Sequence, residues 1–326
     1  MKISVFGGGA WGTTLAQYLY KNSHEVSLWE FDETHLNYLK KYRYPMFFPH
    51  VKLSKKIFLI DNIRETVKNA EILLLTVPSQ AIRSTLKEIC RYSNKNQIFV
   101  IASKGIEIKT GELLSSIVMK ELKTKNVVVL SGPSFAIEVA KGFPTAIVAA
   151  GEKKVSKIVQ ECFSSANLRI YTNTDIIGVG AGGSLKNIIA IACGIAKGMG
   201  LGDNSLAAIV TRGLVEITSI GIKLGAKRET FSGLSGLGDL VMTSFSQNSR
   251  NESFGELIGK GLKTNAAIKK IGMTVEGVYT TKAVMRLAKK FNIEMPITNE
   301  VYNIIFKHKD PKKAITTLMT RDKKPE

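Results

Sequence analysis

The chain has 326 residues, of which 44% are hydrophobic and 22% charged, and it carries a formal net charge of +19. Such a chain can form one large domain or two of ordinary size, and its composition is typical of soluble globular proteins. The apolar stretches at residues 72–75 and 188–193 are far too short to span a bilayer, so no membrane insertion is expected. Met1 and Lys2 lead directly into an apolar run, which predicts no secretory signal and a cytoplasmic location.

The basic residues are spread along the whole chain rather than clustered. Nucleic-acid binders more often show basic clusters with interleaved aromatic residues, so we expect no nucleic-acid partner. The positive field would instead attract a doubly anionic substrate. Cys90, Cys162 and Cys193 lack metal-ligand spacing, as do the four histidines. We therefore expect free thiols in a reducing compartment and no metal site.

The first 175 residues alternate between β-rich runs and helical segments. Predicted strands lie at residues 3–6, 25–29, 57–59, 72–77, 99–102, 127–130 and 145–149. This alternation predicts an α/β fold, a doubly wound parallel sheet, in a first domain over residues 1–175.

From about Asp175 onward, apolar residues recur with helical spacing and strand-like runs become rare. The segments concerned are 184–197, 206–224, 282–291 and 297–306. We therefore predict an all-helical C-terminal domain over residues 176–326, which would bind the substrate.

A glycine cluster follows the first predicted strand. The sequence Gly7-Gly8-Gly9-Ala10-Trp11-Gly12 fits G-x-G-x-x-G, and a helix is expected from Thr13. The first glycine permits a tight turn, the second allows a pyrophosphate to approach, and the third lets helix and strand pack closely. The helix N-terminus adds N–H groups for the phosphates. These features predict dinucleotide binding; the alternative is a glycine-rich turn of another α/β domain.

The end of the second strand bears on the choice of cofactor. Glu30 and Asp32 lie about 20 residues after the glycines, where a carboxylate binds the ribose 2′-hydroxyl of NAD and repels a 2′-phosphate. No Arg or Lys lies between Lys21 and Lys40. This segment favours NADH over NADPH, unless both acids simply face solvent.

Three further sequence motifs have the residues expected of a ligand-binding or catalytic site. Lys104, in the SKG block, follows a strand and is expected at the carboxyl edge of the sheet, where ligands bind in such folds. The SGPSFA block ends the next strand with a turn and a hydroxyl. In the block GGSLKN we expect a helix to open, with Lys186 in its first turn or two, where a cation is unfavourable. That position indicates a functional role for Lys186, with a structural role as the alternative.

Two downstream residues complete the candidate set. Asp239, in a glycine-rich turn, could orient a lysine ammonium, and Arg250 has the fork of donors that suits phosphate. Taken singly, each would more often be a turn aspartate or a surface arginine.

Taken together, these blocks resemble the bacterial type of NAD(P)-dependent glycerol-3-phosphate dehydrogenase. The likeness runs from the first strand to about Leu318 and includes GGGAWG, SKG, SGPSFA, GGSLKN, GLSGLGDLVMT, SRN, VEGV and MPIT. It implies a Rossmann-like domain followed by an all-helical one. It also implies interconversion of glycerol 3-phosphate and dihydroxyacetone phosphate by hydride transfer, a supply of glycerol 3-phosphate for glycerophospholipid synthesis, and a homodimer.

The resemblance implies roles by position. It makes Lys186 the general acid/base and places Lys104 and Asp239 beside the reacting carbon. With the reasoning above, the expected substrate-binding residues are Lys104, Gly132, Ser134, Lys186, Asp239, Thr243, Ser249, Arg250 and Asn251. The expected cofactor-binding residues are Gly7, Gly9, Ala10, Trp11, Gly12, Glu30, Phe31, Asp32, Lys104, Ala136, Arg250 and Glu276. A lysine that acts as a base needs a lowered pKa, which burial or a second cation such as Lys104 would give.

The sequence departs from the family pattern at a few positions. Ala10 replaces a common serine, and Phe31 stands where many bacterial members have His or Arg, which suit NADPH. Pro49-His50 replaces the Pro-Gly or Pro-Asp of the following loop. The first two bear on the choice of cofactor, and none of the three touches the chemistry.

Two rival functions remain open. A hydroxyacid dehydrogenase of the phosphogluconate or hydroxyisobutyrate kind has the same architecture and a Lys-Asn pair, but the SRN and GLGDL blocks disfavour it. A non-catalytic dinucleotide sensor or a nucleic-acid binder would not explain the presence of Lys104, Lys186 and Asp239 in their motifs.

Overall fold

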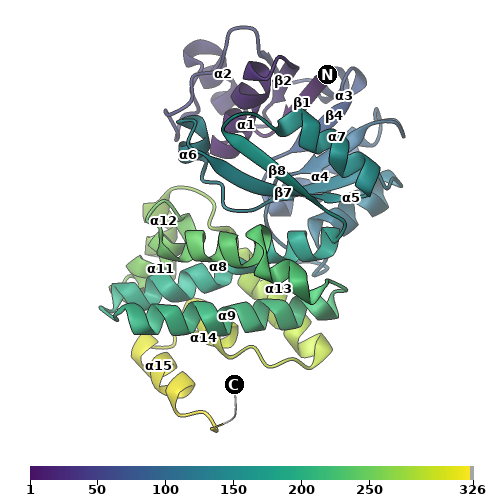
Figure 1. The fold of residues 1–326 in the computed structure, drawn as a ribbon. Coiled ribbons are helices and arrows are strands. Elements are labelled where there is room, and N and C mark those ends of the chain that lie inside the picture. Colours follow the sequence, from purple (N-terminus) through teal and green to yellow (C-terminus); the bar gives the residue numbers. More distant parts are fainter. Residues whose placement is uncertain (324–326) are drawn as a thin grey trace. The chain divides into compact units, whose positions relative to one another are not determined.

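The computed structural model describes residues 1–323, and the chain divides into two compact units (Figure 1). Unit 1 comprises Met1–Lys104 and Glu112–Gly180. Unit 2 comprises Gly105–Gly111 and the chain from Ala181 onward. The fold class is as predicted, a mostly parallel sheet with helices followed by an all-helical region. The domain ranges 1–175 and 176–326 stay predictions, and the last three residues of the second lie outside the described residues.

Unit 1 is built on an eight-stranded sheet with the order β3-β2-β1-β4-β5-β6-β7-β8. The strands are β1 (Lys2–Phe6), β2 (Glu25–Trp29), β3 (Phe58–Ile60), β4 (Ile72–Leu75), β5 (Ile98–Ile101), β6 (Val127–Ser131), β7 (Thr145–Gly151) and β8 (Leu168–Asn173). The order reverses between β1 and β4, which is where ligands bind in doubly wound sheets. Neighbours run parallel except β6 and β7.

Two details of the predicted sheet need correction. β6 and β7 are antiparallel, because the segment between Ser131 and Thr145 contains only the short helix α6 (Ala136–Ala140) rather than a full crossover. The prediction also missed β8, whose residues alternate between buried and exposed at the edge of the sheet. Three of its six residues, Arg169, Thr172 and Asn173, are polar, so the segment gives little apolar signal.

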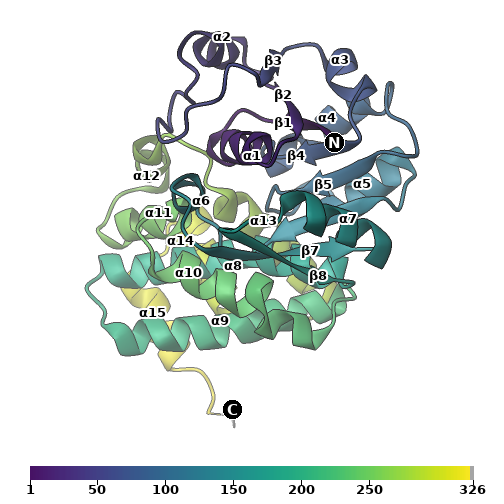
Figure 2. The same cartoon turned by 45° about the horizontal axis from the view of Figure 1, so that its top comes forward.

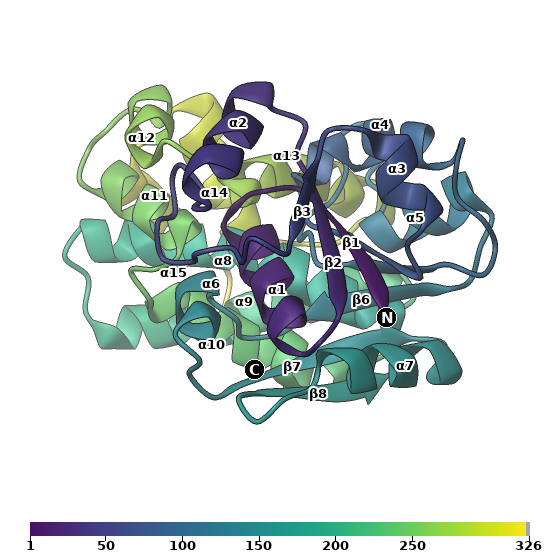
Figure 3. The same ribbon diagram turned by 90° about the horizontal axis from the view of Figure 1, so that it is seen from above.

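Helices cover both faces of the sheet. Besides α6, unit 1 contains α1 (Ala10–Lys21), α2 (Glu33–Tyr42), α3 (Ile63–Lys68), the 3₁₀ turn η1 (Ser79–Ala81), α4 (Ile82–Ile89), α5 (Leu114–Leu122) and α7 (Lys153–Phe163). Leu15 and Leu19 of α1 share one buried core with Val159 and Phe163 of α7, so these two helices cover the same face. α3, α4 and α5 lie on the opposite face (Figure 3). Right-handed crossovers in a sheet that winds in two directions produce this division.

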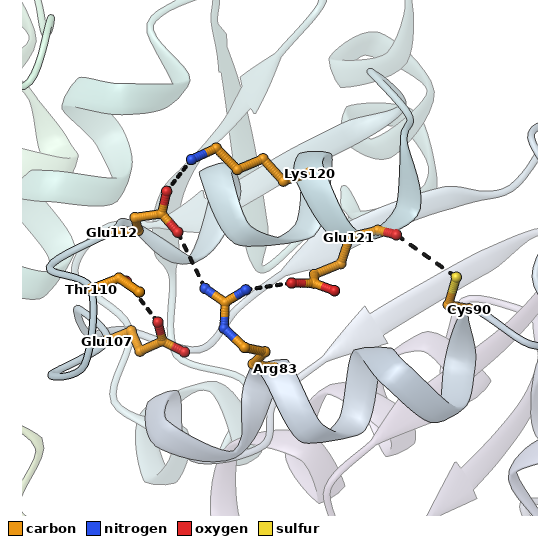
Figure 4. Close-up of polar contacts among 7 residues, drawn as sticks. All are labelled: Arg83, Cys90, Glu107, Thr110, Glu112, Lys120 and Glu121. Atoms are coloured by element: carbon orange, nitrogen blue, oxygen red, sulfur yellow. Dashed lines mark hydrogen bonds and ion pairs between the residues drawn. The ribbon is translucent and has the colours of Figure 1, made fainter.

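An ion-pair network joins α4 to α5 (Figure 4). The Arg83 guanidinium contacts the carboxylates of Glu112, at 3.2 Å, and of Glu121, and Lys120 also pairs with Glu112. The hydrogen bond from Lys120, followed by the Arg83 contact, holds the pKa of Glu112 below its usual value. These side chains connect two helices of unit 1 at its surface, and we assign them a structural role.

Unit 2 is helical. Its elements are α8 (Ile176–Gly198), which begins in unit 1, α9 (Asp203–Lys223), η2 (Arg228–Ser232), the π-helical turn η3 (Leu234–Gly238), α10 (Asp239–Phe245), α11 (Arg250–Gly259), α12 (Thr264–Ile271), α13 (Glu276–Phe291), α14 (Pro296–Lys307) and α15 (Pro311–Met319). Residues 181–196 of α8 are all buried, so α8 is the core helix of this unit. α9 packs beside α8, with Gly213 against Ile189 (Figure 2).

Two helices are long and apolar enough to cross a membrane by length and composition alone, α8 and α9. In α8, 83% of the most apolar window is buried inside the protein, and in α9 the figure is 44%. Core helices of soluble proteins pass the same test, and the burial of α8 is that of a core helix.

Candidate active site

The glycine cluster of unit 1 forms the turn between β1 and α1. Gly7 has a φ of +112°, a conformation that side chains rarely adopt. A Cβ on Gly12 would lie 1.9 Å from the carbonyl oxygen of Gly7, so only glycine fits there. A Cβ on Gly9 would meet nothing within 4 Å, which leaves space for a ligand at the start of α1. Ala10 and Trp11 form the first turn of α1, which carries no acidic side chain. The loop therefore fits a dinucleotide pyrophosphate.

The acids at the end of β2 have different roles. The Glu30 carboxylate accepts hydrogen bonds from the backbone N–H of Gly8, at 2.6 Å, and of Asp32, at 2.9 Å. This fixes a negative charge beside the glycine loop. The Asp32 carboxylate instead caps α2 by accepting from His35 N at 2.8 Å. Phe31 is 85% exposed.

At the ends of β5 and β6, two polar side chains converge on one carbonyl. Lys104 Nζ donates to the carbonyl oxygen of Gly132 at 3.2 Å, and Ser134 Oγ donates to the same oxygen at 3.0 Å. Gly132 has a φ of +135°, and a Cβ there would lie 3.0 Å from Ile147 Cα. Ala136 follows as the first residue of α6. These predicted residues therefore lie at the carboxyl edge of the sheet.

In unit 2, three predicted residues form a buried cluster. The Lys186 ammonium pairs with the carboxylate of Asp239 and donates to Thr243 Oγ1 at 2.6 Å. Thr243 Oγ1 in turn donates to the carbonyl oxygen of Asp239 at 2.6 Å. Lys186 is 4% and Asp239 0% exposed. A charge this deep requires a compensating partner, and Asp239 provides it.

The prediction that a helix opens at Gly182 was wrong. α8 begins at Ile176, so Lys186 lies well inside it, and the argument from the helix dipole does not apply. Glycine is required at position 182 for a different reason: a Cβ on Gly182 would lie 2.4 Å from the carbonyl oxygen of Ser235. Its missing side chain lets α8 touch the π-helical turn η3 directly, and Asp239 follows that turn.

The SRN block forms the start of α11. Ser249 is the N-cap and its hydroxyl accepts from Glu252 N at 3.2 Å, while Arg250 is the first helical residue. Desolvation lowers the pKa of Arg250 and the Glu276 carboxylate raises it. Because the side chain is nevertheless exposed, we regard it as charged. A cation next to the N–H groups of a helix N-terminus is suited to bind an anion.

One contact was missed by the sequence reasoning. Asn251 Nδ2 donates to Asn187 Oδ1 at 3.0 Å, and Asn251 Oδ1 accepts from the backbone N–H of Gly277 at 2.9 Å. This chain of amides links α8, α11 and the start of α13, where Glu276 is the first residue. Asn187 follows Lys186 in the GGSLKN block, but no local signal pairs it with the SRN block 64 residues later.

The predicted site residues thus form two groups. Unit 1 holds the glycine loop, the end of β2 and the group around Gly132, and unit 2 holds the lysine cluster and the start of α11. Within residues 1–323, no group of three or more His, Cys, Asp or Glu side chains could hold a metal ion.

A glycine loop at the switch point of a mostly parallel sheet, followed by a helical unit with a buried lysine, defines a dinucleotide-dependent oxidoreductase. The models for the N-terminus and the C-terminus of NAD-dependent glycerol-3-phosphate dehydrogenase match residues 2–156 and 175–316. The chain belongs to the NAD(P)-dependent glycerol-3-phosphate dehydrogenase family, which confirms the resemblance found in its motifs.

Relatives of this family match over the full chain. The glycerol-3-phosphate dehydrogenase [NAD(P)+] of Fusobacterium nucleatum is 45% identical and covers 100% of this chain and 98% of its own. That of a Thermoanaerobacter species is 46% identical, with 100% and 99% covered. The crystal structure of glycerol-3-phosphate dehydrogenase from Coxiella burnetii has a TM-score of 0.95 at 35% identity and covers 98% of this chain and 99% of its own.

Proposed function

We propose that this NAD(P)-dependent enzyme interconverts glycerol 3-phosphate and dihydroxyacetone phosphate, with Lys186 as the general acid/base. The observation that carries the proposal is the buried cluster of Lys186, Asp239 and Thr243 in a member of this family. The product would supply glycerophospholipid synthesis in the cytoplasm. In this proposal residues 1–175 bind the dinucleotide and residues 176–326 bind the substrate.

Reduction requires a hydride at C2 of dihydroxyacetone phosphate and a proton at its oxygen. The bound nicotinamide supplies the hydride. Lys186 as an ammonium gives its proton to the developing alkoxide, and in the oxidative direction its amine takes the proton back. Asp239 favours the ammonium form and, with Thr243, holds Nζ in place. Positioned proton transfer of this kind accelerates reactions typically by about 10²–10⁴-fold.

The other predicted residues take binding roles in this proposal. Lys104 polarises the substrate carbonyl. Gly132 and Ser134 form the turn whose carbonyl oxygen, that of Gly132, accepts a hydrogen bond from the Lys104 ammonium. Arg250, with the N-terminus of α11, binds the phosphate. The remaining residues proposed to contact substrate or cofactor are Gly7, Gly9, Ala10, Trp11, Gly12, Ala136, Ser249, Asn251 and Glu276.

We propose NADH as the preferred cofactor. Glu30 places a fixed carboxylate beside the glycine loop, where a 2′-phosphate would be repelled. The next two lysines after this segment have other partners: Lys40 pairs with Asp61 at 3.4 Å, and Lys41 Nζ lies 5.0 Å from the ring centroid of Tyr42.

We also propose a homodimer, and the face of α9 away from the core supports it. Ala208, Thr211, Val215 and Ile222 are exposed and follow one another at helical spacing. A second copy that packs antiparallel on this stripe, about a two-fold axis near its centre, would cover these side chains in both copies. Such a contact uses the same patch on each copy, as a two-fold interface requires.

A direct assay tests the reaction. Purified enzyme with NADH should oxidise the cofactor when dihydroxyacetone phosphate is added, and with NAD it should oxidise glycerol 3-phosphate. 6-Phosphogluconate and 3-hydroxyisobutyrate, the substrates of the rival class, should give no activity. Activity with either of these and none with glycerol 3-phosphate would refute the proposal.

A further inference from the structure

Helices α8 and α11 touch backbone to backbone through two facing glycine pairs. Gly194 and Gly198 of α8 are four residues apart, as are Gly255 and Gly259 of α11. A Cβ on any of the four would lie 2.0–2.2 Å from a backbone oxygen of the other helix. Since each glycine fits against the opposing backbone, neither helix can shift along the other without collision.

An ion pair between a half-buried lysine and a buried carboxylate lies within this contact. Lys197, between the two glycines of α8, binds Glu252 Oε1 of α11 at 2.8 Å. Glu252 is 0% exposed, and its Oε2 has no hydrogen-bond partner among the described residues. The hydrogen bond that Lys197 donates to Glu252 also raises the pKa of Lys197. Lys197 therefore compensates a carboxylate that would otherwise be buried with little to offset its charge.

Glu252 belongs to the first turn of α11, the turn proposed to bind phosphate. Its N–H donates to the hydroxyl of the N-cap Ser249, and it follows Arg250 and Asn251 directly. On the other side of this turn, Asn251 is bound by Asn187. The first turn of α11 is thus fastened to α8 at two points, one ionic and one through an amide.

We propose that Lys197 and Glu252 are positioning residues that set the affinity of the enzyme for the phosphate of its substrate. The inference rests on the proposed function, in which Arg250 and the N-terminus of α11 bind that phosphate. The ion pair holds the first turn of α11 in the orientation that lets Arg250 form a bidentate contact. The proton transfer at Lys186 does not depend on it, so its loss changes substrate binding and leaves the chemical step intact.

The experiment compares Lys197→Gln and Glu252→Gln with Lys260→Gln. The control removes an exposed ion pair with Glu256 on the same helix. In both test variants the KM for dihydroxyacetone phosphate should rise about tenfold or more, with kcat within threefold and the KM for NADH unchanged. The Ki of inorganic phosphate, as a competitive inhibitor, should rise in parallel. Lys197→Arg should recover most of the affinity, and Lys260→Gln should behave like the wild type.

Unphosphorylated dihydroxyacetone separates positioning from a merely structural role. If the pair positions the phosphate site, kcat/KM for dihydroxyacetone stays constant while that for the phosphate ester falls. An equal fall for both substrates would overturn the inference. If the single variants fold poorly, the double variant Lys197→Met with Glu252→Met removes both charges at once and should show the same selective loss.

The failure of the inference can be told from the failure of the proposed function. If Arg250→Ala raises the KM for dihydroxyacetone phosphate and Lys197→Gln does not, only the positioning role is wrong. If Arg250→Ala binds dihydroxyacetone phosphate normally, the phosphate site is misplaced and the inference falls, while the proposed reaction stands. If the wild type does not reduce dihydroxyacetone phosphate, the proposed function is wrong and the inference falls with it.

Discussion

Lys186 and Asp239 show how much of the site could be predicted at the scale of single residues. The two residue types were assigned to the reaction from their motifs, and the structure places them in contact although they lie 53 positions apart. The argument that Lys186 lies in the first turns of a helix was nevertheless wrong, because the glycine pair Gly182-Gly183 was taken as the start of that helix. Those glycines serve a tertiary contact, between Gly182 and Ser235, that a local pattern does not reveal.

The first prediction concerns Lys186→Ala. Turnover should fall by at least about 10²–10⁴-fold, because the variant has no group that protonates the alkoxide. NADH affinity, measured by fluorescence titration, should change little. The variant leaves the buried Asp239 carboxylate without this partner, and such a loss typically costs about 3–5 kcal/mol, so folding should be checked by thermal melting. Turnover within tenfold of the wild type would remove Lys186 from the mechanism.

The second prediction concerns cofactor choice. We expect kcat/KM to be roughly tenfold or more higher with NADH than with NADPH, since about 1.4 kcal/mol of repulsion at Glu30 already gives a factor of ten. Phe31→Arg should narrow the difference by placing a cation where the 2′-phosphate would lie. The matched control is Phe47→Arg, at another exposed phenylalanine, which should leave the ratio unchanged. A wild-type preference for NADPH would show that the acidic end of β2 was misinterpreted.

At the scale of elements, local chemistry could be predicted and long-range pairing could not. The turn from β1 to α1 was placed because its glycines, apolar strand and helix lie within 20 residues. β8 was missed because half of its residues are polar and its partner β7 determines where it lies. The facing glycines of α8 and α11 are both visible in the sequence, but only the fold brings them together.

A further prediction concerns Glu216, whose side chain connects helices α9 and α14. This buried residue of α9 binds the start of α14, accepting from the N–H groups of Ile297 and Thr298 and from the Thr298 hydroxyl. Desolvation raises its pKa, and these hydrogen bonds oppose the rise.

Because the folded state binds the proton more tightly, the contribution of Glu216 is complete below its ordinary pKa of about 4.3 and declines as the pH rises through the raised value. Each unit of the shift is worth about 1.4 kcal/mol. The free energy of unfolding of the wild type minus that of Glu216→Gln should therefore decrease between pH 4 and pH 8, as measured by urea denaturation. A difference that is constant or increases with pH would contradict this.

At the scale of the whole molecule, the proposed homodimer gives a prediction about how two copies associate. Copies with a net charge of +19 repel one another, so a stable dimer needs a favourable surface such as the exposed stripe on α9. Val215→Asp, in the middle of that stripe, should raise the dimer dissociation constant by about a hundredfold or more, because like charges across an interface cost several kcal/mol. Light scattering during size-exclusion chromatography measures the mass. Met319→Asp, at an 80% exposed residue of α15, serves as the control. If Val215→Asp remains as dimeric as the wild type, the contact lies elsewhere.

The division of the chain into units has a consequence for how such a protein can be dissected or recombined. Residues 105–111 interrupt the sequence of unit 1 but belong to unit 2, where Gly105 N–H donates to Ser184 Oγ at 2.9 Å and Arg286 binds the carbonyl oxygen of Ile108 at 3.0 Å. The helix α8 continues through the next crossing, at Gly180. The chain therefore passes between units three times, and no single cut yields two complete modules. A gene fragment that ends near residue 175 would encode seven residues, 105–111, whose partners in unit 2 it lacks.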